Sequence, residues 1–274
     1  MRVTTCGPAR TALTLPVRAL SVPFALMLAS VLVFVVACSS SQPVTLGDMS
    51  YPGSPPLKLD APQAAFPDGA CPGSLRTVRS GPDIYGAWWE VRDDSSAVLM
   101  VGRSTDGGKG WSIVQPGDTL DRSRRGCARP APAIAADSAT NYVDLAYFLE
   151  AREGPGVFFT HSMNARQLGS GDGIFHAPVP VIYGTTPARV SVSVAGDHVA
   201  VAYEDPNAER AMVGLALSHT MGHIFEQRFP ISLPNLPAHD PTVALQGDSA
   251  VVQWWERPDS LQTGGRVAMR SARW

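Results

Sequence analysis

The feature that most constrains this chain is a pattern that occurs four times between residues 75 and 274. Each copy contains a β-rich run with aromatic residues that closes on Glu, then a loop, then a second β-rich run that closes on Ser. The glutamates are Glu90, Glu150, Glu204 and Glu256, and the serines are Ser104, Ser162, Ser218 and Ser271. The serines are 58, 56 and 53 residues apart. Such regular spacing indicates one supersecondary unit repeated four times.

Each copy has enough strand-forming segments for a four-stranded sheet. An apolar run opens every copy, and a further strand-like run follows the Ser-led turn in the first three. No stretch with helical periodicity occurs after the N-terminal apolar segment. Four short strands in about 55 residues are typical of a propeller blade. We therefore expect residues 57–274 to form an all-β domain, a small β-propeller of about four four-stranded blades.

The fourth copy is incomplete, which predicts how the blades close into a ring. The chain ends at Trp274, four residues into the fourth turn, so the outer strand of that copy is missing. Residues 57–60 resemble the outer strands at 179–182 and 228–234. We expect Leu57–Asp60 to supply the missing strand, because an N-terminal strand in that place would cover an exposed sheet edge.

The first Ser-led turn, residues 104–111, has the composition of a tight hairpin. It follows the pattern S-x-D-x-G-x-x-W, formed by Ser104, Asp106, Gly108 and Trp111. Ser and Asp side chains can bond to the turn backbone, Gly permits positive φ, and the indole packs beside the turn. Residues 218–225 keep the Ser, the Gly and an aromatic residue at the same spacing, with Thr in place of Asp.

This turn resembles the Asp-box of sialidase-type (BNR) β-propellers at all four defining positions. In that family the box is structural, so the resemblance implies the fold and no catalytic residue. The sialidase catalytic motifs, namely F/Y-R-I-P, three carboxylate-binding arginines and a Tyr–Glu pair, are not found. Arg76 and Arg189 are the nearest candidates for the arginine cluster, and two are too few.

The N-terminus predicts a location outside the cytoplasm. Arginines precede an apolar run at 22–37, and Cys38 follows Ala37, which is typical of a bacterial lipoprotein signal (residues 1–37) with lipid on Cys38. The alternative is an uncleaved helix over 19–37, long enough to span a bilayer. Both predict a membrane-anchored domain on the periplasmic side or the cell surface. Residues 38–56 are rich in Ser, Pro and Gly, and we expect a flexible tether there.

Two cysteines, Cys71 and Cys127, remain in the predicted extracytoplasmic domain. In an oxidising compartment such a pair is expected to form a disulfide. A metal site needs more ligands than two cysteines, and there is no C-x-x-C motif. His219 and His223 have the spacing of a helical metal pair, but they lie in a predicted turn. We therefore expect no metal and no cofactor.

Several polar residues are candidates for a ligand-binding face. The four glutamates hold equivalent positions in the repeat, and symmetry would place them around one face of the ring, with His239 and Asp240 at the mouth of the channel. One interpretation is a site for a cation or a basic ligand. The other is that each Glu bonds backbone groups or a nearby arginine, and that His239 and Asp240 make a structural contact.

Two Trp-Trp pairs, 88–89 and 254–255, are similarly open to two interpretations. Neighbouring residues of a strand point to opposite faces, so one Trp of each pair should pack between blades. The other could contact the next blade, a carbohydrate or a protein.

Charge excludes one class of function. The formal net charge is −2, whereas a nucleic-acid-binding protein needs a basic stripe. The arginines at 122, 124, 125 and 129 are expected to form a solvated loop. A rigid propeller with variable loops suits binding. We expect a binding or scaffold module for another extracytoplasmic protein or membrane complex. The alternative is a carbohydrate-binding or glycoside-acting protein.

Overall fold

The computed structural model describes residues 43–57, 59, 61–169, 174–257 and 264–274. The predicted signal or anchor at residues 1–37 and the predicted lipid attachment at Cys38 lie outside these residues. In the described part of the chain, no helix is long and apolar enough to cross a membrane. The only helical element among those residues is the short 3-10 helix η1 (Ala165–Gln167).

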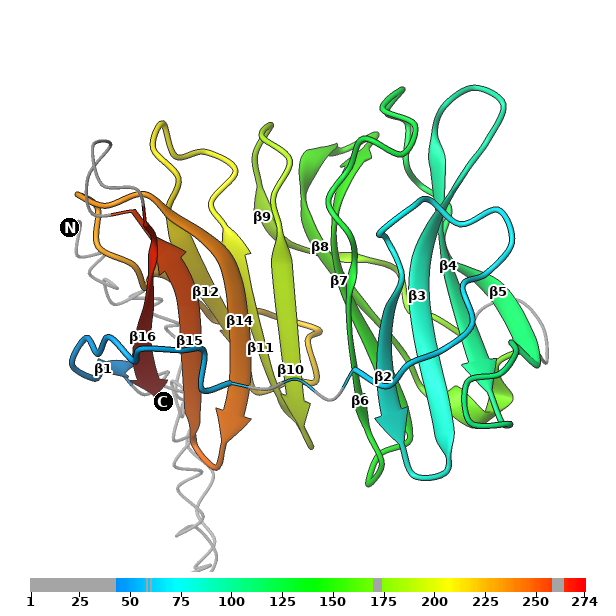
Figure 1. Ribbon diagram of the computed structural model, residues 1–274, viewed down its shortest axis with the longest axis horizontal. Coiled ribbons are helices and arrows are strands. Elements are labelled where there is room, and N and C mark those ends of the chain that lie inside the picture. The colour runs from blue at the N-terminus through cyan, green and yellow to red at the C-terminus, as the bar shows by residue number, and fades with distance from the viewer. Residues whose placement is uncertain (1–42, 58, 60, 170–173, 258–263) are drawn as a thin grey trace, which may run out of the picture. The chain divides into compact units, whose positions relative to one another are not determined.

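Four antiparallel sheets of four strands make up the fold, which confirms the all-β prediction (Figure 1). The first sheet contains β2 (Arg76–Ser80), β3 (Asp83–Val91), β4 (Ala97–Ser104) and β5 (Ile113–Asp118). The second contains β6 (Ala133–Asp137), β7 (Tyr142–Ala151), β8 (Gly154–Ser162) and β9 (Val179–Tyr183). The third contains β10 (Val190–Ala195), β11 (His198–Glu204), β12 (Val213–Ser218) and β13 (Gln227–Pro230). The fourth contains β14 (Ala238–Gln246), β15 (Ser249–Glu256), β16 (Arg266–Arg273) and β1 (Thr45–Leu46).

Each sheet packs face to face on the next, so the second and third sheets are buried on both faces. In β7, Leu145 and Tyr147 belong to a core shared with the first sheet, whereas Ala146 and Phe148 belong to a core shared with the third. In β11 the alternation continues, and Ala200 faces the fourth sheet. Because successive residues of a strand point to opposite faces, a strand buried on both faces is apolar throughout.

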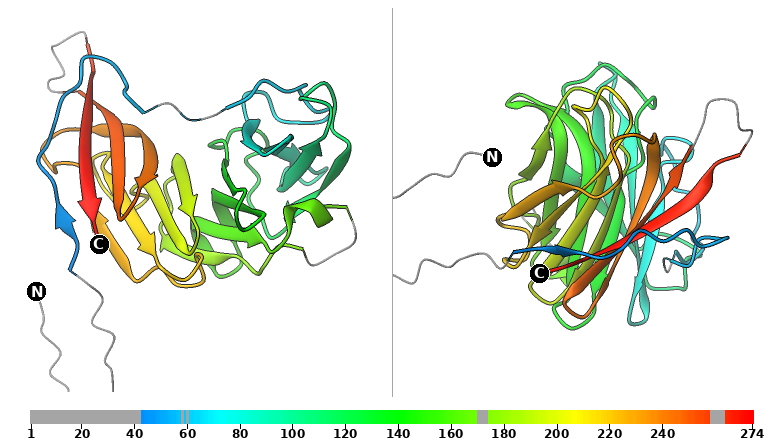
Figure 2. Two further views of the ribbon diagram at one scale, coloured as in Figure 1. Left: turned by 90° about the horizontal axis from the view of Figure 1, so that it is seen from below. Right: turned by 90° about the vertical axis from the view of Figure 1, so that its left-hand side faces the viewer.

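The innermost strands of the four sheets line a central cavity, and the sheets form an arc that is open between the fourth sheet and the first (Figure 2). Strand β2 packs on β6, β6 on β10, and β10 on β14 (Figure 2). Each of these strands contributes residues to the lining of the cavity, which has a volume of about 470 Å³. Four-stranded sheets arranged around an axis with their first strands innermost form a β-propeller-like fold.

The fourth sheet is completed by an N-terminal strand, but not by the predicted one. Thr45 and Leu46 of β1 pair with Arg273 and Ala272 of β16, and Ser50 pairs with Met269. The prediction that Leu57–Asp60 forms this strand is wrong. The closing strand also lies within residues 38–56, so the predicted boundary between tether and domain at residue 57 comes too late.

Residues 57, 59 and 61–65, here called the connecting segment, lie between the fourth sheet and the first (Figure 2). At its start, the backbone N–H of Leu57 donates to Gln253 Oε1 of β15 at 3.1 Å. Further along, the Thr77 hydroxyl of β2 donates to the Pro62 carbonyl at 2.6 Å. The segment then reaches the turn at residues 104–111, where Ala65 N–H donates to the Gly108 carbonyl at 2.7 Å and Trp111 Nε1 donates to the Ala65 carbonyl at 2.8 Å.

Internal hydrogen bonds hold that turn in one conformation. Ser104 Oγ donates to Asp106 Oδ1 and accepts from the Gly108 N–H, at 2.8 and 2.9 Å. The same Asp106 oxygen accepts from the backbone N–H groups of Lys109 and Gly110. The Asp106 carboxyl therefore has a lowered pKa, chiefly because of the Ser104 hydrogen bond. The Ser and Asp side chains thus satisfy the backbone donors that the turn leaves free.

The turn at residues 218–225 of the third sheet is equivalent to the turn at 104–111 of the first, but the two turns pack against different parts of the chain. Gly222 N–H donates to Ser218 Oγ at 3.1 Å, as Gly108 does to Ser104. A Cβ atom at Gly222 would meet the Phe159 ring of the second sheet, whereas one at Gly108 would lie 2.4 Å from the Gln63 carbonyl. The connecting segment therefore covers the first sheet where a preceding sheet covers the third.

A disulfide joins Cys71, which precedes β2, to Cys127, which precedes β6. Cys71 is buried in the core between the first and second sheets. The bridge closes a loop over a sequence separation of 56 residues and so links the first two repeats.

We predict that Gly108→Ala destabilises the domain more than Gly107→Ala. Both glycines have positive φ, and no atom lies within 4 Å of a Cβ at Gly107. The Gly107 variant should lose about 1–2 kcal/mol of unfolding free energy through backbone strain alone. The Gly108 variant should lose about 2 kcal/mol more, because its methyl group displaces residues 63–64. Chemical denaturation measures both, and equal losses would contradict the role of the connecting segment.

We also predict that replacing Cys71 and Cys127 together with Ser lowers the free energy of unfolding by about 3–4 kcal/mol. The cost arises because the unfolded chain regains the freedom that the long closed loop removes. Denaturation of the oxidised wild type, the reduced wild type and the variant measures the effect. The reduced wild type should match the variant; a variant as stable as the oxidised protein would exclude a stabilising bridge.

Candidate functional site

Charged side chains gather at the end of the central cavity where the innermost strands begin. The wall of the cavity consists of small and β-branched residues, among them residues 133–136 of β6 and 190–194 of β10. Arg76, Arg189 and Asp240 lie at the starts of their strands and line the same cavity. Ala61, from the connecting segment, contributes to the remaining side.

Glu204 is the centre of a polar network between the third and fourth sheets. Its carboxylate accepts backbone N–H bonds from Arg189 and Asp240, each at 3.1 Å. Arg189 Nη1 lies 3.6 Å from Glu204 and 2.8 Å from the Asp240 carboxylate. His239 Nδ1 lies 3.7 Å from Glu204. These contacts fix Glu204, while Arg189, Asp240 and His239 remain partly exposed and able to contact a ligand.

Asp240 has an unusual backbone conformation. Its φ is +55°, and the register of β14 against β15 shifts between His239 and Thr242. Asp tolerates the left-handed region better than most residues, and an irregularity of this kind redirects side chains at the end of a strand. Strained backbone that persists in a structure often marks a functional position.

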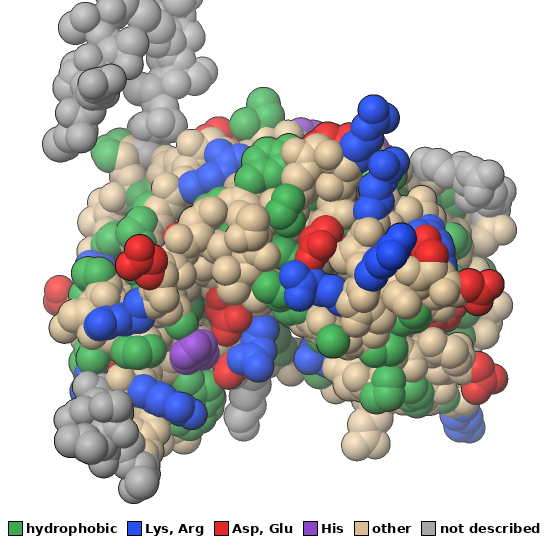
Figure 3. Space-filling model, turned by 90° about the horizontal axis from the view of Figure 1, so that it is seen from above, with side chains coloured by type: hydrophobic (Ala, Val, Ile, Leu, Met, Phe, Trp, Pro, Cys, Tyr) green, Lys and Arg blue, Asp and Glu red, His purple; other side chains and the backbone are tan. Residues whose placement is uncertain are grey.

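A second hollow adjoins this network and contains an exposed tryptophan. It is lined by Arg189, His239, Asp240, Trp255, Arg257 and Gly265. Trp255 of β15 is directly paired with His239 of β14, and 45% of its surface is exposed. On the face shown in Figure 3, acidic, basic and histidine side chains lie side by side next to a hollow. We call Arg189, His239, Asp240 and Trp255 the mouth cluster.

Of the six residues predicted to form a ligand face, the structure brings together Glu204, His239 and Asp240. The other three glutamates have local partners. Glu90 accepts from Trp88 Nε1, Glu150 pairs with Arg125, and the buried Glu256 accepts from Trp254 Nε1 and pairs with Arg266. These contacts favour the alternative interpretation, in which each Glu bonds within its own neighbourhood, over a ring of four glutamates around one ligand. Glu204 fits this interpretation as well, because it accepts two backbone N–H bonds and pairs with Arg189.

The tryptophan pairs also differ from each other. Trp88 and Trp89 are both fully buried, and Trp89 contacts Tyr147 of the second sheet edge to face. Trp254 is buried between the third and fourth sheets, and only Trp255 is exposed. The sequence could not separate these cases, because the exposure of Trp255 depends on what covers the fourth sheet.

One arginine of the predicted solvated loop is buried. Arg129 was expected to be solvated, but its side chain is 3% exposed and pairs with Asp121 at 2.9 Å. Its guanidinium also lies over the Trp89 ring, 5.2 Å from the centroid. Arg129 therefore covers the core next to the disulfide, which corrects the solvated-loop prediction at this position.

His219 and His223 are close in the sequence but belong to different groups of aromatic rings. His219 contacts His198 and Trp274, whereas His223 contacts His161 and His176. Burial and then the neighbouring His176 and His223 lower the pKa of His161 to about 4, with a weaker opposing effect of the Met221 backbone. His161 is therefore neutral at pH 7. The expectation that His219 and His223 form no metal pair stays a prediction. The grouping of His223 with His161 and His176 was not predicted from the sequence.

Comparisons with known proteins assign no family. No protein-family model and no curated protein matches the chain, so the Asp-box resemblance gains no support from them. Among solved structures, the chain is similar to a xylan beta-1,4-xylosidase from Bacillus halodurans C-125, with 12% identity and a TM-score of 0.44. This match covers 77% of the chain and 43% of the xylosidase, so the chain spans less than half of that protein.

Two further structures show similarity at the same level. A thermostable family-43 glycoside hydrolase has 11% identity and a TM-score of 0.42, over 71% of this chain and 69% of the hydrolase. An N-acetylgalactosamine deacetylase from F. plautii, in complex with blood group B trisaccharide, has 12% identity and a TM-score of 0.41, over 75% and 76% of the two chains. At these identities and TM-scores the matches assign neither an activity nor a substrate to this chain.

Proposed function

We propose that this domain is an extracytoplasmic saccharide-binding module whose ligand occupies the mouth cluster. The observation that carries the proposal is the exposed indole of Trp255 in a hollow with Arg189, His239 and Asp240. A concave site in which an aromatic ring lies beside a few convergent polar groups is typical of ligand binding.

The chemistry of this hollow is complementary to a sugar ring. A pyranose has an apolar face of C–H groups and a rim of hydroxyl groups. The flat indole can pack against the C–H face and remove it from water. The guanidinium, carboxylate and imidazole groups can exchange hydrogen bonds with the hydroxyls. Among the described residues, Trp255 is the only tryptophan that is exposed.

The arrangement supports binding rather than hydrolysis. Glycoside hydrolysis uses two carboxyl groups that flank the scissile bond, one of which donates a proton. Here the Glu204 oxygens accept two backbone N–H bonds, and Arg189 pairs with both Glu204 and Asp240. These contacts make Glu204 a support for the cluster. The module would therefore act by recognition, alone or within a membrane complex.

We predict that Trp255→Ala weakens saccharide binding by about tenfold or more, through loss of the stacking surface. Glycan-array screening of the wild-type protein identifies the ligand, and calorimetry compares the variants. Phe66→Ala is the matched control, because Phe66 is exposed and lies outside the hollow. Its affinity should equal that of the wild type.

An absence of saccharide binding by the wild-type protein, together with a stable protein partner in detergent-solubilised membranes, would contradict the proposal. That outcome would favour the scaffold interpretation.

We further propose that a lipid on Cys38 holds the domain at the membrane, on the periplasmic side or the cell surface. The proposal is supported by the apolar run and the small residue before Cys38. We predict that Cys38→Ser abolishes the incorporation of labelled fatty acid. Labelling in the producing bacterium and mass spectrometry of the mature N-terminus measure this. An intact residue 1 in the wild-type protein would instead indicate the uncleaved anchor.

A further inference from the structure

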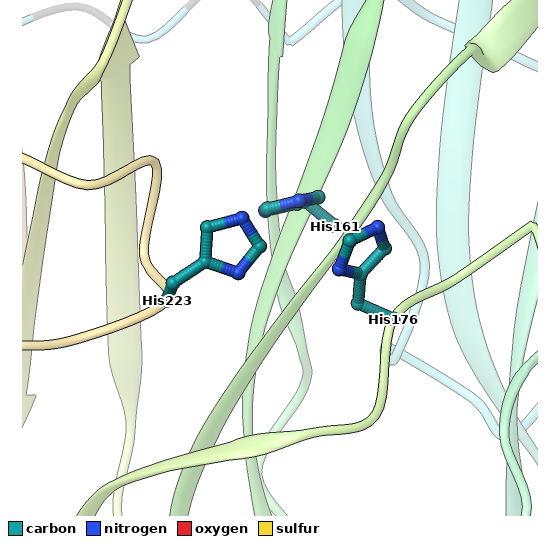
Figure 4. A group of neighbouring side chains, drawn as sticks. All are labelled: His161, His176 and His223. Atoms are coloured by element: carbon teal, nitrogen blue, oxygen red, sulfur yellow. The ribbon is translucent and has the colours of Figure 1, made fainter.

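Three histidines from distant parts of the sequence meet at the contact between the second and third sheets (Figure 4). His161 belongs to β8, His176 follows the β-bridge between Ser162 and Phe175, and His223 belongs to the turn after β12. Each residue offers a ring nitrogen, and these three nitrogens lie within 4.8 Å of one another. The chain has six histidines, so half of them form this group, which we call the histidine cluster.

The innermost member, His161, makes no hydrogen bond of normal distance and angle with the described residues, and the Met221 backbone is only a weakly interacting neighbour of its ring. It is 2% exposed, yet neither Nδ1 nor Nε2 makes a hydrogen bond. Its ring stacks on Tyr142, and the Phe159 ring contacts it edge to face. Aromatic packing explains the orientation of the ring, but it leaves both nitrogens unsatisfied. Buried polar atoms without a partner are rare and indicate a missing one.

The backbones that carry the cluster are fixed independently of the imidazole rings. His176 N–H donates to the His161 carbonyl at 3.0 Å, and the Thr160 hydroxyl donates to the His176 carbonyl at 2.6 Å. His223 N–H donates to the Thr220 carbonyl within the Ser-led turn. Gly222 places this turn directly against the Phe159 ring. The positions of the three histidines are thus set before any ligand binds.

We propose that His161, His176 and His223 bind one divalent transition-metal ion, and Zn²⁺ is the ion whose chemistry fits best. Zn²⁺ binds neutral imidazole at 2.0–2.1 Å with tetrahedral geometry, which places the ligand nitrogens about 3.3 Å apart. The ring centroids are separated by 4.6, 5.0 and 5.2 Å. Binding of one ion would require the more exposed His176 and His223 rings to rotate, so that the nitrogens approach from their present separations of up to 4.8 Å.

The cluster is not a by-product of the sequence repeat. The residue before the closing Ser is His161 in the second copy, but Arg103, Leu217 and Arg270 in the other copies. The turn position of His223 corresponds to Lys109 in the first copy. These two repeat positions therefore carry histidine where the second and third sheets meet and other residues in the copies compared, as expected for a site placed on a repeated scaffold.

The site leaves one coordination position open. No fourth His, Cys, Asp or Glu of the described chain joins the group, and His223 is exposed to solvent. Three protein ligands with an open fourth position differ from the closed four-ligand arrangement of structural zinc sites. We infer that water or an external ligand completes the coordination and that the metal exchanges with solution.

Direct metal titration tests this proposal. The full-length chain, produced without a polyhistidine tag and freed of metal, is titrated with Zn²⁺ by calorimetry and with Co²⁺ by visible absorption. The variants are His223→Gln and His176→Gln, whose side chains are not fully buried, so that folding should be preserved. His219→Gln is the matched control, because His219 lies close in sequence to His223 but outside the cluster.

We expect one Zn²⁺ per chain and the absorption of four-coordinate Co²⁺ in the wild type and in His219→Gln. Zn²⁺ affinity should fall by about 100-fold or more in either cluster variant, since each loses one of only three protein ligands. Zn²⁺ should raise the melting temperature of the wild type but not that of His223→Gln. A wild-type chain that takes up no Zn²⁺, or unchanged affinity in both cluster variants, would overturn the proposal.

Discussion

Face-to-face burial of β-sheets is the constraint on which the rest of the structure depends. A sheet whose strands are apolar on both faces is stable only if another surface covers each face. The second and third sheets meet this condition through their neighbours. The first and fourth sheets each lack one neighbouring sheet. The N-terminal segment covers part of the first sheet, whereas at the fourth it only completes the edge and leaves Trp255 exposed. Strand β1 pairs with the edge of the fourth sheet, and residues 63–65 lie against the turn of the first.

This arrangement explains why the Ser-led turns are structural. At the third sheet the turn contacts the preceding sheet through Gly222, and at the first sheet the same geometry contacts the connecting segment through Gly108. In each turn the serine hydroxyl accepts a backbone N–H bond, and either Asp106 or Thr220 accepts others. The turn that holds Gly222 against Phe159 also presents His223 to His161, so one contact between sheets supports both packing and a candidate metal site.

Both candidate sites arise where one repeat departs from the others. Glu204 differs from its three counterparts because Arg189 and Asp240 direct their backbone N–H groups towards it. Trp255 differs from Trp89 because the corresponding face of the fourth sheet is not fully covered. The repeated units thus supply a rigid frame, and substitutions at single positions within that frame supply the chemistry.

The sequence by itself determined the four sheets, because strand periodicity, turn composition and the spacing of the repeats are local properties of the chain. It also limited the choice of a cysteine pair, since only Cys71 and Cys127 remain in the domain. It could not identify β1, because two residues with no distinctive pattern complete the sheet. Only the tertiary structure decided which glutamate faces the mouth of the cavity, that Arg129 is buried, and that His161 and His223 meet. Each of these depends on how separate sheets pack, and strand periodicity carries no information about which residues of two different sheets come into contact.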